Sequence, residues 1–169
     1  MDAIQTARLT ILPLTVDVAQ AAARDRAELA RLLDARVPDD WPGPDFAGYL
    51  PTLVELLAHD AELSRWVRLA VQTSERLLIG DMGFHGPPDE QGTVEVGYSI
   101  VPASRRQGYA SEGVLALIAW AFDQPQVQRV VARCAPDNIA SRRILEKAGL
   151  RQVGVADPLL HWELPRTDR

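Results

Sequence analysis

Residues 104–113 read SRRQGYASEG and place two arginines, a glutamine and a glycine directly before an apolar run. Gly108 permits a positive φ or a close approach of the backbone to a ligand. The N–H groups of residues 106–110 would open a helix, where unpaired N–H groups and the helix dipole both favour negative charge. Arg105 and Arg106 add positive charge that suits a diphosphate. The loop therefore predicts an anion site; the alternative is an ordinary helix start with two solvated arginines.

Glu95 is the carboxylate best placed to take a proton from a substrate. It lies in TVEVGYSIV (93–101), which reads as a strand. Its side chain would point away from the face of Val94 and Val96 and could act as a general base. The alternative is a solvated or ion-paired strand carboxylate, because alternation alone does not show which face meets a ligand.

Hydroxyl and imidazole groups could supply the rest of an acid–base mechanism. Ser141 follows Asn138 by one helical turn and could donate to a leaving group. Alternatively, Asn138 caps the helix and Ser141 packs. His85 follows a predicted strand and could be a base or a substrate contact, or could bond to a backbone carbonyl. Tyr98 and Tyr109 could act as acids or could pack with their hydroxyls near water.

The elements that must position these groups alternate between strands and helices. Strands are predicted at 8–14, 66–72, 77–84, 93–101, 128–135, 150–155 and 159–165. Helices are predicted over 18–35 and 46–60, along the run VLALIAWAF after the loop, and over 140–148. Thr15 or Asp17 would cap the first helix and Asp45 the second, with Pro51 disturbing or dividing it. Gly149 would end the last helix. One α/β domain over residues 1–169 with a mixed sheet is expected.

Composition narrows the class of function. The chain has 169 residues and a formal net charge of −5. General nucleic-acid binding is therefore not expected, because affinity for the phosphate backbone comes mostly from Lys and Arg. Cys134 is the single cysteine, and no His/Cys spacing indicates a metal. No signal peptide, membrane-length apolar run or nucleotide-binding glycine motif is present. These features favour a cytoplasmic protein that is bound to no membrane.

Four motifs in order resemble one known family. Arg105-x-x-Gly108-x-Ala110 matches the Arg/Gln-x-x-Gly-x-Gly/Ala signature of the GNAT acetyltransferase superfamily. The other stretches are IGDMGFHGPPD (79–89), VEVGYSIVP (94–102), and Asn138-x-x-Ser141 followed by LEKAGL (145–150). The chain is most similar to the branch that includes ribosomal-protein N-terminal (alanine/serine) acetyltransferases. The resemblance covers residues 8–165 and is most specific from 79 to 154.

The resemblance implies a fold and a ligand. The fold is a single domain with a mixed, mostly antiparallel sheet of about seven strands, flanked by about four helices, whose fourth and fifth strands splay apart. The ligand is acetyl-CoA, with its diphosphate on the signature loop and its pantetheine arm along the fourth strand. The residues implied in coenzyme binding are Ile100, Val101, Arg105, Arg106, Gln107, Gly108, Tyr109, Ala110, Asn138 and Ser141.

The resemblance also implies direct transfer of an acetyl group to a primary amine, either a protein α-amine or a small molecule, without a metal. Glu95 would be the base, through water, and Ser141 the group on the acid side. Leu145 stands where many family members have a tyrosine acid. That departure keeps open a second reading, a catalytically silent acyl-CoA sensor or scaffold.

The acceptor is expected on the side covered by the first two helices and their loop. Trp41, His85 and Tyr98 are the candidate acceptor contacts. For Trp41 the alternative is burial in the core. The aspartates of the loop at 37–46 would attract a cationic amine. The resemblance implies a monomer or a homodimer, and nothing in the sequence decides between the two.

Overall fold

The computed structural model describes residues 3–156 and 158–167. The described strands form one sheet in the order β1-β2-β3-β4-β5-β6-β8-β7. Every neighbouring pair is antiparallel except β5 and β6, which are parallel. The strands are β1 (Ile4–Gln5), β2 (Leu9–Pro13), β3 (Val67–Gln72), β4 (Leu77–Phe84), β5 (Thr93–Ile100), β6 (Arg129–Cys134), β7 (Arg151–Ala156) and β8 (Leu159–Pro165).

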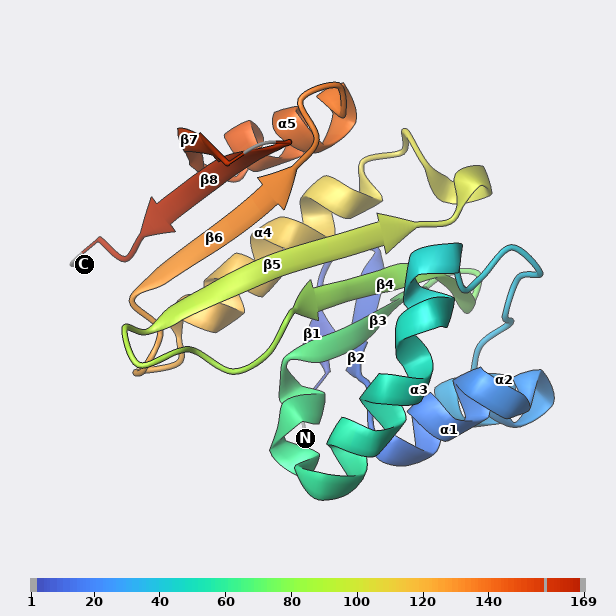
Figure 1. Cartoon of the computed structure of the whole chain (residues 1–169). Helices are drawn as coiled ribbons and strands as arrows, with labels where there is room; N and C mark the ends of the chain where they lie inside the picture. Colours follow the sequence, from blue (N-terminus) through green and yellow to red (C-terminus); the bar gives the residue numbers. More distant parts are fainter. Residues whose placement is uncertain (1–2, 157, 168–169) are drawn as a thin grey trace.

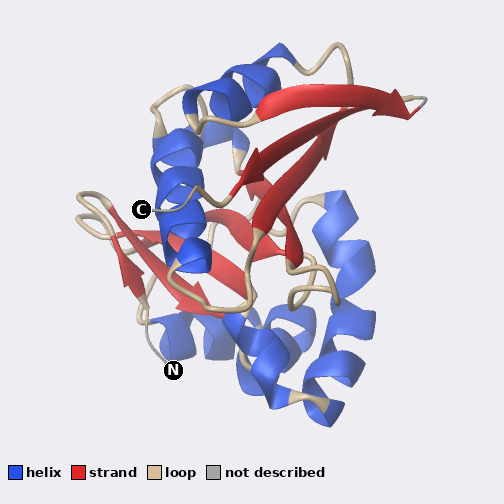
Figure 2. Ribbon diagram, turned by 90° about the vertical axis from the view of Figure 1, so that its left-hand side faces the viewer, coloured by secondary structure: helices blue, strands red, loops and turns tan. Residues whose placement is uncertain are grey.

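Helices cover both faces of the sheet. The α-helices are α1 (Val16–Arg24), α2 (Arg26–Leu33), α3 (Pro44–His59), α4 (Tyr109–Phe122) and α5 (Ile139–Lys147). In Figure 1, α4 runs behind β5 while α3 lies in front of β3 and β4, and Figure 2 shows the same arrangement from the side. Met82 of β4 packs so closely on Gly113 of α4 that an added Cβ would lie 2.5 Å from its sulfur. The α/β fold with a mostly antiparallel sheet is confirmed.

The first predicted helix is in fact two helices, and Asp25 is the reason. Thr15 caps α1, as expected, by accepting a hydrogen bond from the N–H of Val18. At Asp25 the backbone turns extended, with φ −145°, and its N–H bonds back to Ala21 to close α1. The carboxylate of the same residue accepts from the N–H of Glu28 and so starts α2. One aspartate therefore ends one helix and caps the next.

The start of α3 also differs from the prediction. Gly43 is the N-cap and Pro44 occupies the first turn, so Asp45 lies inside the helix instead of capping it. Pro51 lies within α3, which continues through it to His59. Pro51 therefore does not divide the helix.

The splay between the two central strands is confirmed. β5 pairs with β6 only from Thr93 to Glu95, opposite Arg129 to Val131. Beyond this stretch β5 stays paired with β4 as far as Ile100, and β6 stays paired with β8 as far as Cys134. The two strands therefore diverge toward their carboxyl ends, as Figure 1 shows. The opening between them leaves one edge of β5 without a strand partner.

Candidate active site

The signature loop lies at the end of β5 and opens α4. Gly108 has φ +85° and is the N-cap of α4, and Arg106 also has a positive φ of +58°. No side chain caps this helix start. Residues 105–108 are exposed. The first N–H groups of α4 are therefore open to an anion, in the region where the helix dipole favours one.

Arg8 holds the signature loop in place. Its Nη1 donates to the carbonyl of Gln107 at 2.9 Å, and its Nε donates to Glu112 at 2.7 Å. The guanidinium lies 4.5 Å from the centre of the Tyr109 ring. Arg105 also braces the loop, because its Nε donates to the carbonyl of Ile100 at 2.7 Å. The sequence alone did not identify Arg8, because its partners follow about 100 residues later.

The opening between β5 and β6 contains a small cavity of about 270 Å³. It gathers five of the predicted site residues, which come from β5, α5 and the loop after β4: His85, Glu95, Tyr98, Asn138 and Ser141. Cys134 and Leu145 complete part of its wall. The structure thus brings together residues that lie up to 56 positions apart in the chain.

Glu95 is an ion-paired carboxylate at this opening. Arg133 of β6 donates to both of its oxygens, at 2.7 and 2.8 Å. Nδ1 of His85 lies 3.6 Å from the same carboxylate. Burial acts to raise the pKa of Glu95, but the nearby imidazole of His85 and the hydrogen bonds from Arg133 outweigh it and lower the pKa to about 2. Glu95 is therefore ionised at neutral pH.

Tyr98 and Ser141 form a hydroxyl pair across the opening. Their oxygens are 2.7 Å apart and join β5 to the first turn of α5. Asn138 caps α5 by accepting from the N–H of Ser141 at 3.0 Å. Burial raises the pKa of Tyr98, so the phenol keeps its proton at neutral pH. Leu145, at the family's tyrosine position, is buried, and Tyr98 supplies a phenol to the same cavity.

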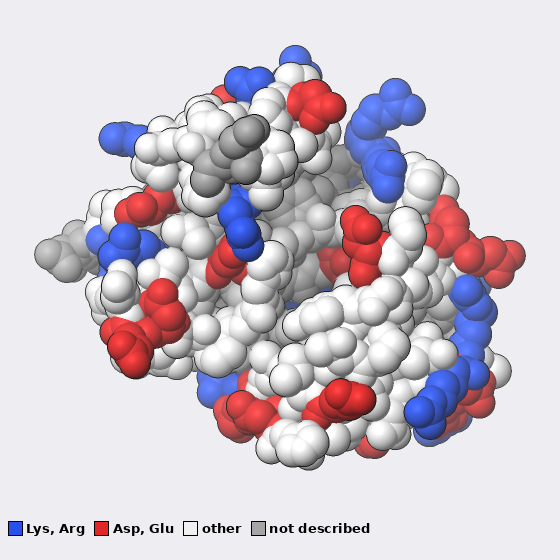
Figure 3. All heavy atoms as spheres, in the orientation of Figure 1, with Lys and Arg blue, Asp and Glu red and all other residues white. Residues whose placement is uncertain are grey.

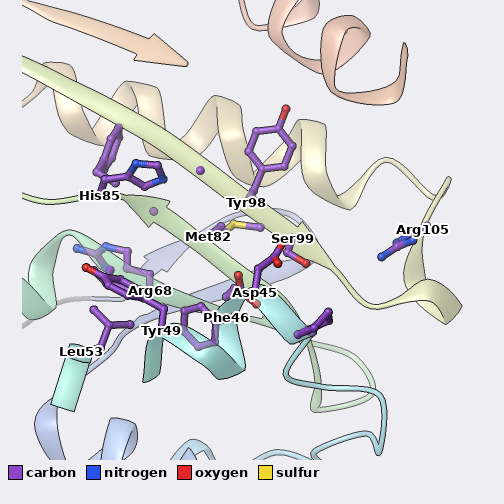
Figure 4. Close-up of a pocket in the computed structure, with 17 residues that line it drawn as sticks. Asp45, Phe46, Tyr49, Leu53, Arg68, Met82, His85, Tyr98, Ser99 and Arg105 are labelled. Carbon is purple, nitrogen blue, oxygen red and sulfur yellow. The ribbon is translucent and has the colours of Figure 1, made fainter. Parts of the chain in front are cut away.

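A larger cavity of about 700 Å³ lies between α3 and the strands β4 and β5. It shares His85, Gly97 and Tyr98 with the smaller one. Figure 4 shows Phe46, Tyr49 and Leu53 of α3 on one side of it and Ser99 of β5 on the other, while the ring of Tyr98 points away from α3. In Figure 3 the surface is hollowed between the part of the molecule that carries β6 and the part that carries α3. The two cavities together form a path across β5.

Trp41 lies in the core, the alternative that the sequence left open. Only 2% of its surface is exposed, and its ring centre is 5.8 Å from that of Phe46. Its Nε1 donates to Oδ2 of Asp81 at 3.2 Å. Asp81 lines the larger cavity and was missed from the sequence. The signal was present, because Asp81 is the only charged residue within the apolar strand LLIGDMGF.

Asp81→Asn is expected to stabilise the fold at neutral pH. Burial raises the pKa of Asp81 from 3.8 to about 6, against a lowering by the Trp41 hydrogen bond. The folded state therefore favours the protonated acid, and the ionised carboxylate destabilises the fold increasingly as pH rises from about 4 to 6. Asn keeps an oxygen for Trp41, so we expect about 1–2 kcal/mol of added stability at pH 7 and little near pH 4. Thermal unfolding at both pH values measures this, and a lower Tm at pH 7 would contradict it.

Among residues 3–156 and 158–167, no group of three or more His, Cys, Asp and Glu side chains could hold a metal ion. In that same part of the chain, no helix is both long and apolar enough to cross a membrane.

One family model and one known relative each match most of this chain. The family model described as "Acetyltransferase (GNAT) domain" matches residues 8–151. The chain is 30% identical to the "uncharacterized N-acetyltransferase YjdG" of Bacillus subtilis over 162 residues, which cover 94% of this chain and 95% of that one.

Two solved structures share the fold at lower identity. One is a ribosomal-protein-S5-alanine acetyltransferase from Vibrio fischeri, with 20% identity, a TM-score of 0.69, and coverage of 99% of this chain and 98% of that one. The other is RimL, a ribosomal L7/L12 alpha-N-protein acetyltransferase in complex with coenzyme A. It has 14% identity, a TM-score of 0.67, and coverage of 97% and 98%.

Proposed function

Because the chain belongs to the GNAT acetyltransferase family, we propose that it moves the acetyl group of acetyl-CoA to a primary amine by direct attack in a ternary complex. The observation that carries the proposal is the opening between β5 and β6, which begins after Glu95 and lies beside the exposed start of α4. A coenzyme diphosphate at the helix start would direct its acyl arm along the free edge of β5. The amine would arrive from the larger cavity on the other side of Tyr98.

The backbone of β5 supplies the groups that would bind the acyl arm. The N–H of Val101 donates to Ile79 of β4, at 2.9 Å. Peptide groups alternate in direction along an antiparallel strand, so those of Tyr98 and Ile100 point to the opposite edge, into the opening. Arg105 already bonds to the carbonyl of Ile100 on that edge. We therefore assign the N–H of Tyr98 or Ile100 to the thioester oxygen, which gains negative charge during transfer.

Proton transfer completes the reaction. The amine nitrogen attacks the thioester carbon, a C–N bond forms, the C–S bond breaks, and the sulfur keeps the electron pair. Glu95, ionised and next to the opening, would pass the proton of the amine through a water to solvent. Because its pKa is low, Glu95 is a weak base. It would therefore help to pass the proton on to solvent and would not stay protonated itself. Ser141 would pass a proton to the departing sulfur and take one from Tyr98, whose hydroxyl oxygen lies 2.7 Å away, and Tyr98 would regain its proton from solvent.

Ser141→Ala and Tyr98→Phe are each expected to lower kcat about 10-fold, the effect of losing one hydrogen bond to a charged group. The double variant is expected to be little worse than the poorer single one, because both hydroxyls serve one proton path. The measurement is kcat and the acetyl-CoA Kd for all four proteins. Losses that multiply, or losses that follow weaker acetyl-CoA binding, would show that the pair is not a proton path.

The nature of the acceptor is a further part of the proposal. The two solved structures named above are acetyltransferases of ribosomal proteins S5 and L7/L12. A protein α-amine and a small amine both fit direct transfer, since each needs only a nitrogen at the junction near Gly97 and Tyr98. The test is thiol release from acetyl-CoA across a panel of amines and N-terminal peptides. Binding of acetyl-CoA without release above the uncatalysed rate for any acceptor would instead favour the sensor reading.

A further inference from the structure

Asp81 is a buried carboxylate beside the larger cavity. It lies in the middle of β4, opposite Ser99 of β5, and only 9% of its surface is exposed. Its neighbour Met82 faces α4, so Asp81 faces the side where α3 and Trp41 pack. The register places Asp81 two residues from Gly83, which pairs with Gly97 at the junction of the two cavities.

No cation in the described part of the chain neutralises this carboxylate. Its one side-chain partner there is the indole N–H of Trp41, a neutral donor. Arg68 is buried and also lines the cavity, but its guanidinium lies 4.6 Å from the centre of the Trp120 ring and its Nε donates to the carbonyl of Arg65. Arg105, at the coenzyme end, bonds to Ile100. A buried charge without a counter-charge is unfavourable, so Asp81 would favour a cationic ligand group at its end of the cavity.

The α3 side of the cavity suits a compact apolar body. Phe46, Tyr49 and Leu53 of α3 line it together with Phe84 of β4. A volume of about 700 Å³ is in the range that binds small molecules. Apolar walls would exclude a strongly hydrated chain while Asp81 attracts the positive end of the ligand. The charge and the walls together favour a small amine over a long polar peptide.

Building on the acetyltransferase function proposed above, we propose that the acceptor is a small primary amine with an aliphatic or aromatic body, and that Asp81 binds its ammonium group before transfer. Burial raises the pKa of Asp81 to about 6, which is still below neutral pH. The carboxylate is therefore mostly ionised at pH 7 and can hold a cation. From this position the nitrogen would move toward Gly97 and lose one proton through the water at Glu95 before it attacks. Asp81 is thus a binding residue that sets specificity for charged amines.

The test compares a cationic and a neutral amine of matched size. Cyclohexylamine is a cation near neutral pH, whereas aniline is neutral. The full-length chain and its Asp81→Asn variant are assayed with both amines by thiol release from acetyl-CoA, and aniline is followed as a competitor where its turnover is slow. We expect Asp81→Asn to lower kcat/KM for cyclohexylamine about 10–100-fold, the effect of removing a charged hydrogen bond, and to change aniline less than about 3-fold. Asp17→Asn, an exposed carboxylate on α1, is the charge-matched control.

The outcomes separate the two proposals. A wild-type chain that transfers acetyl to no acceptor would overturn the proposed function, and this inference with it. A wild-type chain that acetylates amines, with both amines equally affected by Asp81→Asn or neither affected, would overturn only the role of Asp81. Activity on peptides with neither small amine accepted would overturn the small-amine class. Thermal unfolding guards against misfolding, because a folded Asp81→Asn protein is expected to keep or raise its Tm while it loses selectivity.

Discussion

Gly108→Val is expected to weaken acetyl-CoA binding at least about 100-fold while the protein stays folded. Gly108 holds φ +85°, which a β-branched residue adopts only with strain. An added Cβ would also lie 3.3 Å from the guanidinium of Arg8, which holds the loop. To relieve this strain, the loop would turn two N–H groups away from the diphosphate. Each lost hydrogen bond to a charged group weakens binding by about 1.5–3 kcal/mol, so the two together raise the Kd more than about 100-fold. Calorimetric titration with acetyl-CoA measures the change.

Gly154→Val is the matched control for this substitution. Gly154 lies on the outer strand β7, and a Cβ added there meets no atom within 4 Å. Its backbone shows no positive φ. This variant is expected to bind acetyl-CoA like the wild type. Equal affinity of Gly108→Val and wild type would mean that the turn before α4 does not hold the diphosphate.

Glu95→Gln is expected to lower kcat about 100-fold and to leave the KM for acetyl-CoA nearly unchanged. General bases contribute about 10²–10⁴-fold. The low end is expected here because Arg133 and His85 keep the carboxylate weakly basic. Raising the pH should partly rescue the variant, because solvent then deprotonates the amine without help. The measurement is the pH profile of kcat for both proteins.

Glu163→Gln is the control for the loss of a strand ion pair. Glu163 of β8 pairs with Arg129 of β6 at 3.6 Å, and neither residue lines the two cavities described above. It should retain wild-type kcat. If both glutamine variants lose activity to the same degree, Glu95 supports the sheet and not the proton transfer. The assignment would also fail if Glu95→Gln changed kcat less than about 3-fold.

Sequence patterns correctly predicted features of the fold that depend on neighbouring residues in the chain. Thr15 and Asn138 cap their helices as their residue types predict, and Gly108 adopts the positive φ that glycine permits. Asp25 was not recognised as a double cap, because the residues on both sides of it are good helix formers. The extended backbone of Asp25 overrides the helix propensity of its neighbours and separates α1 from α2.

The contacts of the candidate site depend on long-range pairing. Arg133 reaches Glu95 because β5 and β6 run parallel for three residue pairs and then diverge. Tyr98 meets Ser141 because α5 begins at the wide end of that opening. Neither partner could be read from spacing along the chain. Asp81 could have been flagged as a lone charge in an apolar strand, but its partner Trp41 lies 40 residues earlier.

The free edge of β5 has a consequence for how this protein can evolve. The peptide groups of Tyr98 and Ile100 are present whatever side chains they carry, with proline as the one residue type that lacks the N–H. Under the proposed function, mutational drift along this strand can therefore alter the walls of the larger cavity while the N–H groups assigned to the acyl arm stay in place. A lineage can in this way exchange one amine for another without rebuilding its donor site.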